Sequence, residues 1–234
     1  MNLVLLFDED FAGETRVRLT GRRRRHLEKV LRVSEGDTIR VGRLGGKTGT
    51  GTIERIARSE LVLDVDLTED PPAPLPVTLL LALPRPKVLS RVLTTITAMG
   101  VKTVVLFDCW RVEKSFWSSP RLARDRMQEA LIEGLAQARD TVVPTVRIER
   151  RFTPFVEDVL PDLVEERVAI VAHPEAKMKV DRGAGEVIAA IGPEGGFIPN
   201  EIEMLGRIGF RPVTLGPRIL HVEAAVPALL AKLG

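Results

Sequence analysis

The chain has 234 residues, of which 44% are hydrophobic and 28% are charged, and its formal net charge is +2. This composition is typical of a globular protein with one large domain or two modest ones, and no apolar run reaches the roughly 18 residues of a membrane-spanning helix. One cysteine excludes an internal disulfide, and three scattered histidines lack the spacing of a zinc site, so we expect a cytoplasmic protein without a metal.

Residues 1–70 have the pattern of a small β domain. Residues 42–51 hold five glycines, which predicts a mobile loop or a wide hairpin. A short helix after the basic run at 22–26 is expected to place Leu27, Val30 and Leu31 on one apolar face. The predicted strands are Val4–Phe7, Arg16–Leu19, Thr38–Val41, Gly51–Ile56 and Leu61–Leu67. Five short strands and one small helix favour a compact β-barrel.

The charge of this domain is segregated. Between Thr15 and Arg58 there are 13 Lys and Arg against 4 Asp and Glu, a local excess of nine positive charges. Such a surface is typical of a protein that binds a polyanion, and a merely solvated basic face is the alternative.

Residues 71–76 mark the domain boundary. Four prolines in six residues predict a stiff linker, because proline cannot join a helix interior or a central strand. From residue 77 to 234 the pattern alternates between strands and helices, as in an α/β domain with a buried parallel sheet. The strands that we predict are Val77–Leu83, Val101–Phe107, Val168–Ala172, Val187–Ile191 and Arg211–Leu215.

Four helices are predicted in this second domain, one of which begins at Pro199 and ends at Gly209. The first has an apolar face from Val88 to Met99 and ends at Gly100. Ser119 and Pro120 are expected to cap a long helix that runs through Ala138. The last helix spans about 223–233 and closes the chain.

Two glycine-rich loops follow the last two predicted strands. The first is Gly192-Pro193-Glu194-Gly195-Gly196, with Pro199 at the start of a helix, and the second is Gly216-Pro217-Arg218. Loops after neighbouring parallel strands lie at one edge of the sheet, where open α/β sheets bind ligands, and glycine lets a ligand approach the backbone. Neither loop has a known nucleotide-binding pattern, and two ordinary tight turns are the alternative.

These loops also carry a resemblance. The segments IGPEGGFIPNEI and LGPRIL, together with HLEKVLRVSEGDTIRV and His173-Pro174-Glu175, resemble the RsmE family of methyltransferases, which methylate N3 of a uridine in 16S ribosomal RNA. The resemblance implies a C-terminal SPOUT α/β domain with a parallel sheet and a trefoil knot, preceded by a PUA-like β-barrel that binds RNA. It also implies S-adenosylmethionine as methyl donor, S-adenosylhomocysteine as product, no metal and no membrane partner. The implied partners are the 30S subunit and a second copy of the chain, as a homodimer.

The resemblance assigns site residues by position. As catalytic residues it implies Arg218, His221 and Glu223. It implies that phosphate contacts come from Arg22, Arg23, Arg24, Arg25, His26 and Arg32. It implies that the cofactor is bound by His173, Pro174, Gly192, Pro193, Glu194, Gly195, Gly196, Leu215, Gly216, Ile219, Leu220 and Ala225. Glu194 has a second interpretation, as an anchor at a helix N-terminus.

The sequence departs from the family pattern after the second loop. Family members usually read Arg-[Thr/Val]-Glu-Thr-Ala there, whereas this chain reads His221-Val222-Glu223-Ala224-Ala225. A fixed cation is thereby replaced by an imidazole, which is either a base toward N3 or a sign of relaxed activity. Two further hypotheses therefore stay open: an RNA-binding relative with reduced or no catalysis, and a methyltransferase that acts on another RNA.

Overall fold

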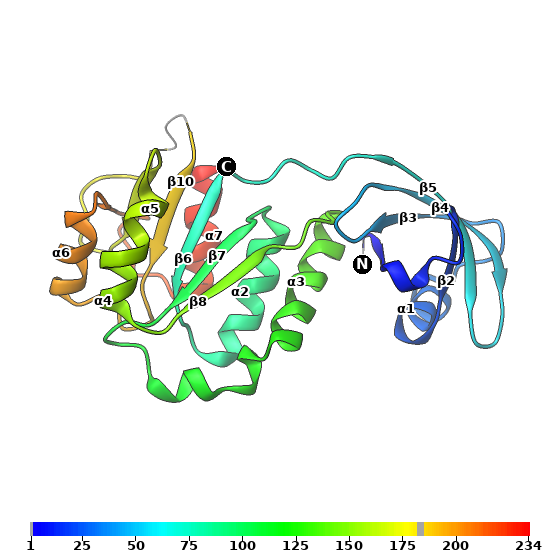
Figure 1. The fold of residues 1–234 in the computed structure, drawn as a ribbon, viewed down its shortest axis with the longest axis horizontal. Helices are drawn as coiled ribbons and strands as arrows, with labels where there is room; N and C mark the ends of the chain where they lie inside the picture. The colour runs from blue at the N-terminus through cyan, green and yellow to red at the C-terminus, as the bar shows by residue number, and fades with distance from the viewer. Residues whose placement is uncertain (1, 182–184) are drawn as a thin grey trace. The chain divides into compact units, whose positions relative to one another are not determined.

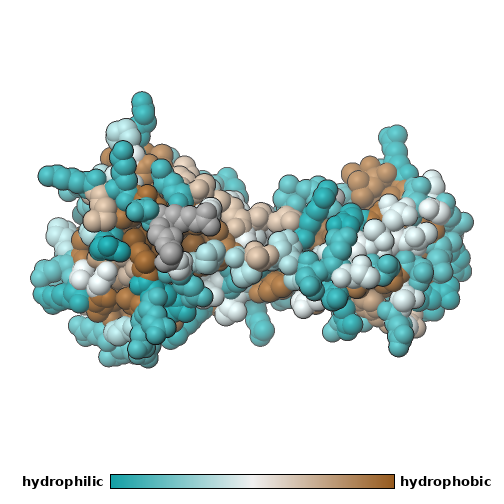
Figure 2. All heavy atoms as spheres, turned by 90° about the horizontal axis from the view of Figure 1, so that it is seen from above, coloured by the Kyte–Doolittle hydropathy of each residue, from teal (hydrophilic) through white to brown (hydrophobic). Residues whose placement is uncertain are grey.

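The computed structural model describes residues 2–181 and 185–234. By packing, the chain divides into one unit of Met1–Ala73 with Ile132–Val143, and a second of Pro74–Leu131 with Pro144–Gly234. The break between residues 73 and 74 falls inside the proline-rich segment. The short Ile132–Val143 segment belongs to the first unit, which no pattern in the sequence predicted. Hydrophilic side chains cover most of the surface that Figure 2 shows, around smaller hydrophobic patches.

The first unit contains a five-stranded sheet in the order β1-β3-β4-β5-β2. The pair β1–β3 is parallel and the other pairs are antiparallel. No pairing joins β1 to β2 within the described ranges, so strand pairing leaves the sheet open where a closed barrel was expected. The strands are β1 (Val4–Leu6), β2 (Arg16–Leu19), β3 (Thr38–Arg43), β4 (Thr48–Ile56) and β5 (Leu61–Glu69).

Alternation along β1 explains why its whole sequence is apolar. Val4 and Leu6 face the core of the sheet, whereas Leu3 and Leu5 pack on Leu135 at the end of helix α3 (Arg124–Ala138). Successive strand side chains point to opposite faces, so a strand covered on both faces must be apolar throughout. Figure 1 shows the connection of this sheet to the second unit through the extended segment after β5.

Two sequence predictions in this unit were wrong in detail. Residues 42–51 form neither a mobile loop nor a wide hairpin, because β3 and β4 are joined by a four-residue turn at 44–47. Gly49 is required there, since a Cβ on it would lie 1.9 Å from the carbonyl oxygen of Asp66 across a bulge between β4 and β5. Gly49 therefore serves close backbone approach rather than mobility.

The short helix also differs from its prediction. It consists of α1 (Gly21–His26) and a π-helical turn, η2 (Leu27–Leu31), which ends at Arg32 with a left-handed φ of 54°. Leu27 is fully buried, but Val30 is 63% exposed and Leu31 is exposed as well. The wider π turn rotates the later residues away from the face that an α-helix would have presented.

The second unit is built on a six-stranded parallel sheet in the order β11-β9-β10-β6-β7-β8, which confirms the predicted α/β class. The central strand β10 lies between β9 and β6 and is buried along its whole length. The strands are β6 (Val77–Ala82), β7 (Thr103–Phe107), β8 (Thr145–Glu149), β9 (Val168–Ala172), β10 (Val187–Ile191) and β11 (Arg211–Val213).

Helices cover both faces of this sheet, with α4, α5 and α6 on one side and α2 on the other (Figure 1). Helix α7 packs on α2 and on β10. The α-helices are α2 (Pro86–Ala98), α4 (Phe152–Pro154), α5 (Leu160–Val164), α6 (Pro199–Arg207) and α7 (Val222–Leu233), and the shorter turns are η1 (Asp8–Asp10), η3 (Lys114–Ser118), η4 (Pro120–Leu122) and η5 (Phe155–Val159).

Three expectations for this unit are corrected. Ser119 caps the short η4 turn by accepting from the backbone N–H of Arg121, and α3 begins only at Arg124. Strand β11 ends at Val213, two residues before the predicted end, because Thr214 folds back on the glycine at 216. The half-buried edge strand β8 and the segment from α4 to α5 were not predicted at all.

Candidate active site

The loops that follow β9, β10 and β11 meet at the carboxyl edge of the parallel sheet. Together with the start of α7 they enclose a cavity of about 280 Å³. Its lining is Ala172, His173, Pro174, Ile191, Gly192, Pro193, Glu194, Gly195, Gly196, Phe197, Thr214, Leu215, Gly216, Arg218, Ile219, Leu220, Val222 and Ala225. This set includes all twelve residues that were predicted to bind a cofactor, and Arg218 as well.

The first loop, residues 192–197, is a tight turn whose shape depends on glycine. The backbone N–H of Gly196 donates to the carbonyl of Pro193 at 2.8 Å, and Gly196 has a left-handed φ of 72°. A Cβ on Gly192 would lie 3.0 Å from the ring of Phe197, so a side chain there would displace the ring. Most of the loop therefore presents bare backbone, which suits a ligand that is held through amides and carbonyls.

Two arginines from distant segments fix this loop. The carboxylate of Glu194 accepts from the backbone N–H of Arg85 at 3.0 Å, and Arg85 is the N-cap of α2. Glu194 thus anchors a helix N-terminus, but that of α2 rather than of the helix that follows it. The guanidinium Nη1 of Arg111 donates to the carbonyl of Gly195 at 2.5 Å.

Glu201 is a structural element of the site that the sequence analysis did not single out. The residue is only 3% exposed, and its carboxylate accepts from the backbone N–H of Ile198 at 2.9 Å, which caps α6. Its other oxygen accepts from the backbone N–H of Trp110 at 2.7 Å. Burial, followed by the charge of Glu201, raises the pKa of the neighbouring Cys109 thiol to about 12. The available signal was the glutamate in the first turn after Pro199.

The second loop, residues 214–221, combines a glycine turn with exposed apolar side chains. The hydroxyl of Thr214 accepts from the backbone N–H of Gly216 at 3.2 Å and lies 3.1 Å from the carbonyl oxygen of the same residue. Ile219 is 85% exposed although it lines the cavity. Arg218 extends from the same turn, so a cation and an apolar surface stand side by side at the cavity.

The other two predicted catalytic residues are not among the described residues that line the cavity. His221 is exposed and is the N-cap of α7, where its carbonyl accepts from the backbone N–H groups of Ala224 and Ala225. Glu223 forms an ion pair with Arg91 of α2, with Oε1 and Nε 2.7 Å apart. Both residues lie at the start of α7, whose first turn lines the cavity through Val222 and Ala225.

The predicted RNA-contacting residues lie together at α1 and η2 of the first unit, but their surroundings differ. Arg23 binds the carboxylate of Asp10 through two hydrogen bonds of 2.5 and 2.6 Å, and Asp10 is only 6% exposed. Arg24 pairs with Glu28 at 2.8 Å. His26 is half-buried, whereas exposed side chains are found at Arg22, Arg25 and Arg32.

Within the described ranges there is no group of three or more acidic, histidine or cysteine side chains arranged to hold a metal ion. None of the helices in the described part of the chain is long and apolar enough to cross a membrane.

Comparison with known proteins gives concordant results. Residues 71–234 match the family described as RNA methyltransferase domain. The ribosomal RNA small subunit methyltransferase E of Synechocystis sp. is 29% identical over 227 residues, which cover 94% of this chain and 73% of that protein. The protein of the same name from Treponema pallidum is 28% identical over 242 residues, covering 99% of this chain and 90% of that protein.

The fold has a close counterpart among solved structures. The crystal structure of a ribosomal RNA small subunit methyltransferase E from Neisseria gonorrhoeae, bound to S-adenosyl methionine, superposes with a TM-score of 0.78. The superposition covers 100% of this chain and 96% of that chain at 24% sequence identity.

Proposed function

The chain belongs to the RNA methyltransferase domain family, and on that basis we propose that it transfers a methyl group from S-adenosylmethionine to N3 of a uridine in 16S ribosomal RNA. The product would be S-adenosylhomocysteine, and the substrate would be the RNA within the small ribosomal subunit. The names of the relatives from Synechocystis and Treponema pallidum support a substrate in the small subunit.

One observation carries the proposal. The cavity at the carboxyl edge of the sheet gathers all twelve residues that the family resemblance assigned to the cofactor, from three separate loops and the first turn of α7. Its lining is mostly glycine backbone and apolar side chains, which suits an adenosine with an attached amino acid. The Neisseria gonorrhoeae protein of the same fold was solved with S-adenosyl methionine bound.

The residues of the chain would act by alignment and electrostatics. S-adenosylmethionine supplies an electrophilic methyl group, so the site must hold donor and uridine in line, and proximity of this kind accounts for much of the rate. Neutral N3 is a poor nucleophile, and loss of its proton to solvent water leaves an anion on the ring. Arg218 lines the cavity, and we assign to it the stabilisation of that anion, since a guanidinium keeps its charge at every physiological pH.

For His221 and Glu223 we assign a positioning role. Val222 and Ala225, which line the cavity, belong to the first turn of α7. The carbonyl of His221 starts that turn, and the ion pair of Glu223 with Arg91 ties it to α2. In this assignment, His221 in place of the family's arginine changes the surface beside the cavity, and the residues that line the cavity stay the same.

The finer organisation belongs to the same proposal. Residues 1–70 would form a PUA-like RNA-binding domain, residues 71–76 a linker and residues 77–234 the SPOUT methyltransferase domain with its trefoil knot. The position of β10 between β9 and β6, with both glycine loops at its carboxyl edge, supports the SPOUT assignment. In the first domain, the exposed Arg22, Arg25 and Arg32 would bind phosphates directly, with Arg23 and Arg24 supporting them through their carboxylate partners.

The exposed apolar side chain at Ile219 favours a homodimer, because a second copy that covers the second loop would complete the site. The cytoplasm is where such an enzyme would meet the small subunit.

The second candidate is an RNA-binding relative with reduced or no catalysis. It is favoured by His221, which replaces the family's cation and lies outside the cavity lining. A methyltransferase retargeted to another RNA is the remaining alternative.

The test is to incubate the protein with labelled S-adenosylmethionine and 30S subunits from a strain that lacks this modification, beside free 16S ribosomal RNA and tRNA. We expect label in the 16S RNA of the 30S particles. Cofactor binding without transfer to any RNA would support the binding-only relative, and label in tRNA alone would support retargeting.

A further inference from the structure

Trp110 is an exposed aromatic residue that the proposed function leaves unexplained. Its side chain is 79% exposed, although its neighbour Cys109 and nearby Val112 are buried. Exposure of a large indole forfeits favourable burial of apolar surface, so an isolated tryptophan in this position calls for a partner that covers it.

The loop that carries Trp110 is held at both ends. The backbone N–H of Trp110 donates to the buried carboxylate of Glu201 at 2.7 Å, and that of Val112 donates to the carbonyl of Cys109 at 3.0 Å. Upstream, the N–H of Asp108 donates to the carbonyl of Glu149 at 2.9 Å. The indole is thus presented by a fixed backbone, which lowers the entropy lost when it binds.

This loop borders the cavity. The next residue, Arg111, donates to the carbonyl of Gly195, which is part of the lining. The aliphatic stem of Arg111 also lies over Gly195, since a Cβ on that glycine would be 3.1 Å from Cδ of the arginine. A nucleotide that enters the cavity past Gly195 therefore brings its neighbours within reach of Trp110.

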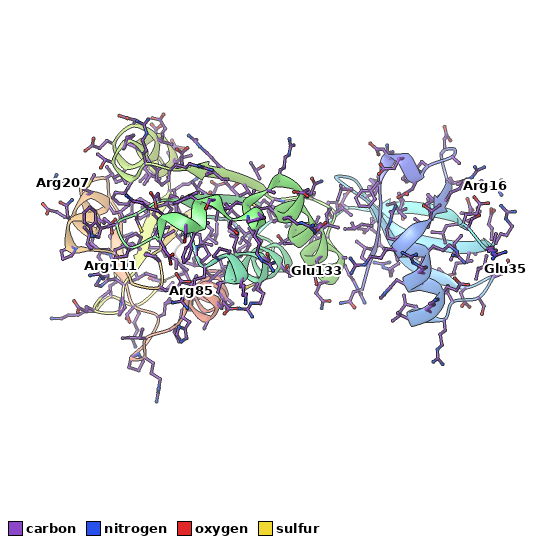
Figure 3. All side chains as sticks on the ribbon, turned by 90° about the horizontal axis from the view of Figure 1, so that it is seen from below. Arg16, Glu35, Arg85, Arg111, Glu133 and Arg207 are labelled. Atoms are coloured by element: carbon purple, nitrogen blue, oxygen red, sulfur yellow. The ribbon has the colours of Figure 1, made fainter. Side chains whose placement is uncertain are left out.

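Cations outnumber acids in the two segments that adjoin the first glycine loop. Arg85 contacts Glu194 and Arg111 contacts Gly195, so two segments, 85–91 and 110–121, adjoin the same loop, and Arg121 links them by donating to the hydroxyl of Ser90 at 3.3 Å. Figure 3 labels Arg85 and Arg111 on this unit. The two segments contain one acid, Glu113, and the cations Arg85, Lys87, Arg91, Arg111, Lys114 and Arg121.

We propose that Trp110 stacks on an unpaired base of the substrate RNA, next to the nucleotide that enters the cavity. The cations of segments 85–91 and 110–121 bind the adjoining phosphates, except for Arg91, which is paired with Glu223. An exposed aromatic ring beside a run of cations is the combination that single-stranded RNA needs, because each base offers a face for stacking and each linkage a negative charge. A protein interface is instead depleted in charge at its centre. The inference rests on the proposed function for the identity of the substrate as RNA.

The other tryptophan provides a matched comparison. Trp117 is half-buried, its Nε1 donates to Asp108 at 2.9 Å, and the guanidinium of Arg150 lies 5.4 Å from its ring centroid. Both the N–H group and the ring of Trp117 therefore already have partners within the protein. With only two tryptophans in the chain, Trp117→Phe leaves Trp110 as the single emitter, and Trp110→Phe leaves Trp117.

The first experiment titrates both single-tryptophan proteins with a synthetic single-stranded RNA decamer and follows tryptophan fluorescence. We expect quenching of Trp110 in the Trp117→Phe protein and little change in the Trp110→Phe protein. Trp110→Ala should weaken decamer affinity by roughly 5- to 100-fold, and Trp110→Phe should restore most of it, because a phenyl ring still stacks. Equal affinity of Trp110→Ala and the native protein would overturn the proposal.

The second experiment separates this inference from the proposed function. Native protein and Trp110→Ala are compared for S-adenosylmethionine affinity, methyl transfer to 30S particles and oligomeric state. We expect unchanged cofactor affinity and oligomeric state with a raised KM for 30S particles. A monomer–dimer shift in Trp110→Ala would show that a second copy covers the indole and would refute stacking on RNA. Failure of the native protein to methylate 30S particles would count against the proposed enzyme activity. Quenching of Trp110 fluorescence by the decamer would still support the proposed RNA-binding surface.

Discussion

The carboxylate of Glu201 accepts from the backbone N–H of Trp110, 91 residues earlier in the chain, at 2.7 Å. The same carboxylate also accepts from the backbone N–H of Ile198 at the start of α6. One buried side chain therefore ties the loop that carries Trp110 to the N-terminus of α6. Arg111 then carries this constraint to the carbonyl of Gly195. The first glycine loop is thereby held in position by bonds from Arg111 and, through Trp110, from Glu201, which come from outside the loop.

Glu201→Gln is therefore expected to lower both stability and cofactor affinity. A glutamine offers one oxygen acceptor and an NH₂ group, so one of the two backbone N–H groups would lose its partner, at a cost of about 1–3 kcal/mol. Urea unfolding and calorimetric titration with S-adenosylmethionine measure the two effects. Glu203→Gln on the same helix is the control, because Glu203 is exposed and pairs with Arg207 on the surface. Equal behaviour of the two variants would refute the bridging role.

Gly196→Ala is expected to weaken cofactor binding and to destabilise the fold by about 1 kcal/mol. The cause is the left-handed φ of 72° at Gly196, which an alanine adopts only with strain. Gly206→Ala in the helical part of α6 is the matched control, and it should raise stability by about 0.5–1 kcal/mol without changing cofactor affinity. Thermal unfolding and cofactor titration of both variants are the measurements, and a Gly196→Ala protein that binds like the native one would contradict the loop's role.

The arginine cluster of the first unit should separate into structural and RNA-binding members. Arg23→Ala leaves the buried carboxylate of Asp10 without its cation, and we expect a loss of about 3 kcal/mol in the free energy of unfolding. Arg25→Ala should change stability by less than about 0.5 kcal/mol but lower RNA affinity and reduce the salt dependence of binding by about one counterion. Denaturant titration and RNA binding at several salt concentrations test this, and the reverse pattern would contradict it.

His221 is expected to contribute little to the chemical step. Because its side chain lies outside the cavity lining, His221→Ala should reduce the rate of methyl transfer by less than about tenfold, whereas a general base contributes about 10² to 10⁴. Arg218→Ala should cost about 100-fold through the loss of anion stabilisation. Single-turnover rates of methyl transfer, measured for both variants across a range of pH, test these two expectations. A 10²-fold loss in His221→Ala, with loss of the acidic limb of the profile, would make His221 the base.

Much of the second unit was predictable because its signals are local. An unbroken apolar run such as Val187–Ile191 forms a strand buried on both faces, and the glycine loop after it has to lie at the edge of the sheet. Parallel strands have their carboxyl ends at one edge of the sheet, and the two glycine loops therefore lie together there. Predicting the lining of the cavity needed only this rule and the family resemblance.

The contacts that hold the loops were not predictable in the same way. The bonds from Arg85 to Glu194 and from Arg111 to Gly195 span 109 and 84 residues, and no local pattern specifies them. Val30 was misplaced because a π turn replaced the expected α-helical one. The structural role of Arg23 followed from the burial of Asp10, which a run of four arginines does not reveal.

The most direct test of the account is mass spectrometry of 16S ribosomal RNA fragments after incubation of unmodified 30S subunits with the protein and S-adenosylmethionine. The account predicts a gain of one methyl group on a single uridine, released by digestion as 3-methyluridine. It also predicts that this gain accumulates about 100-fold more slowly in Arg218→Ala, and less than about tenfold more slowly in His221→Ala. The absence of 3-methyluridine from 16S RNA, with cofactor binding intact, would contradict the central claim that this cavity methylates N3 of a ribosomal uridine.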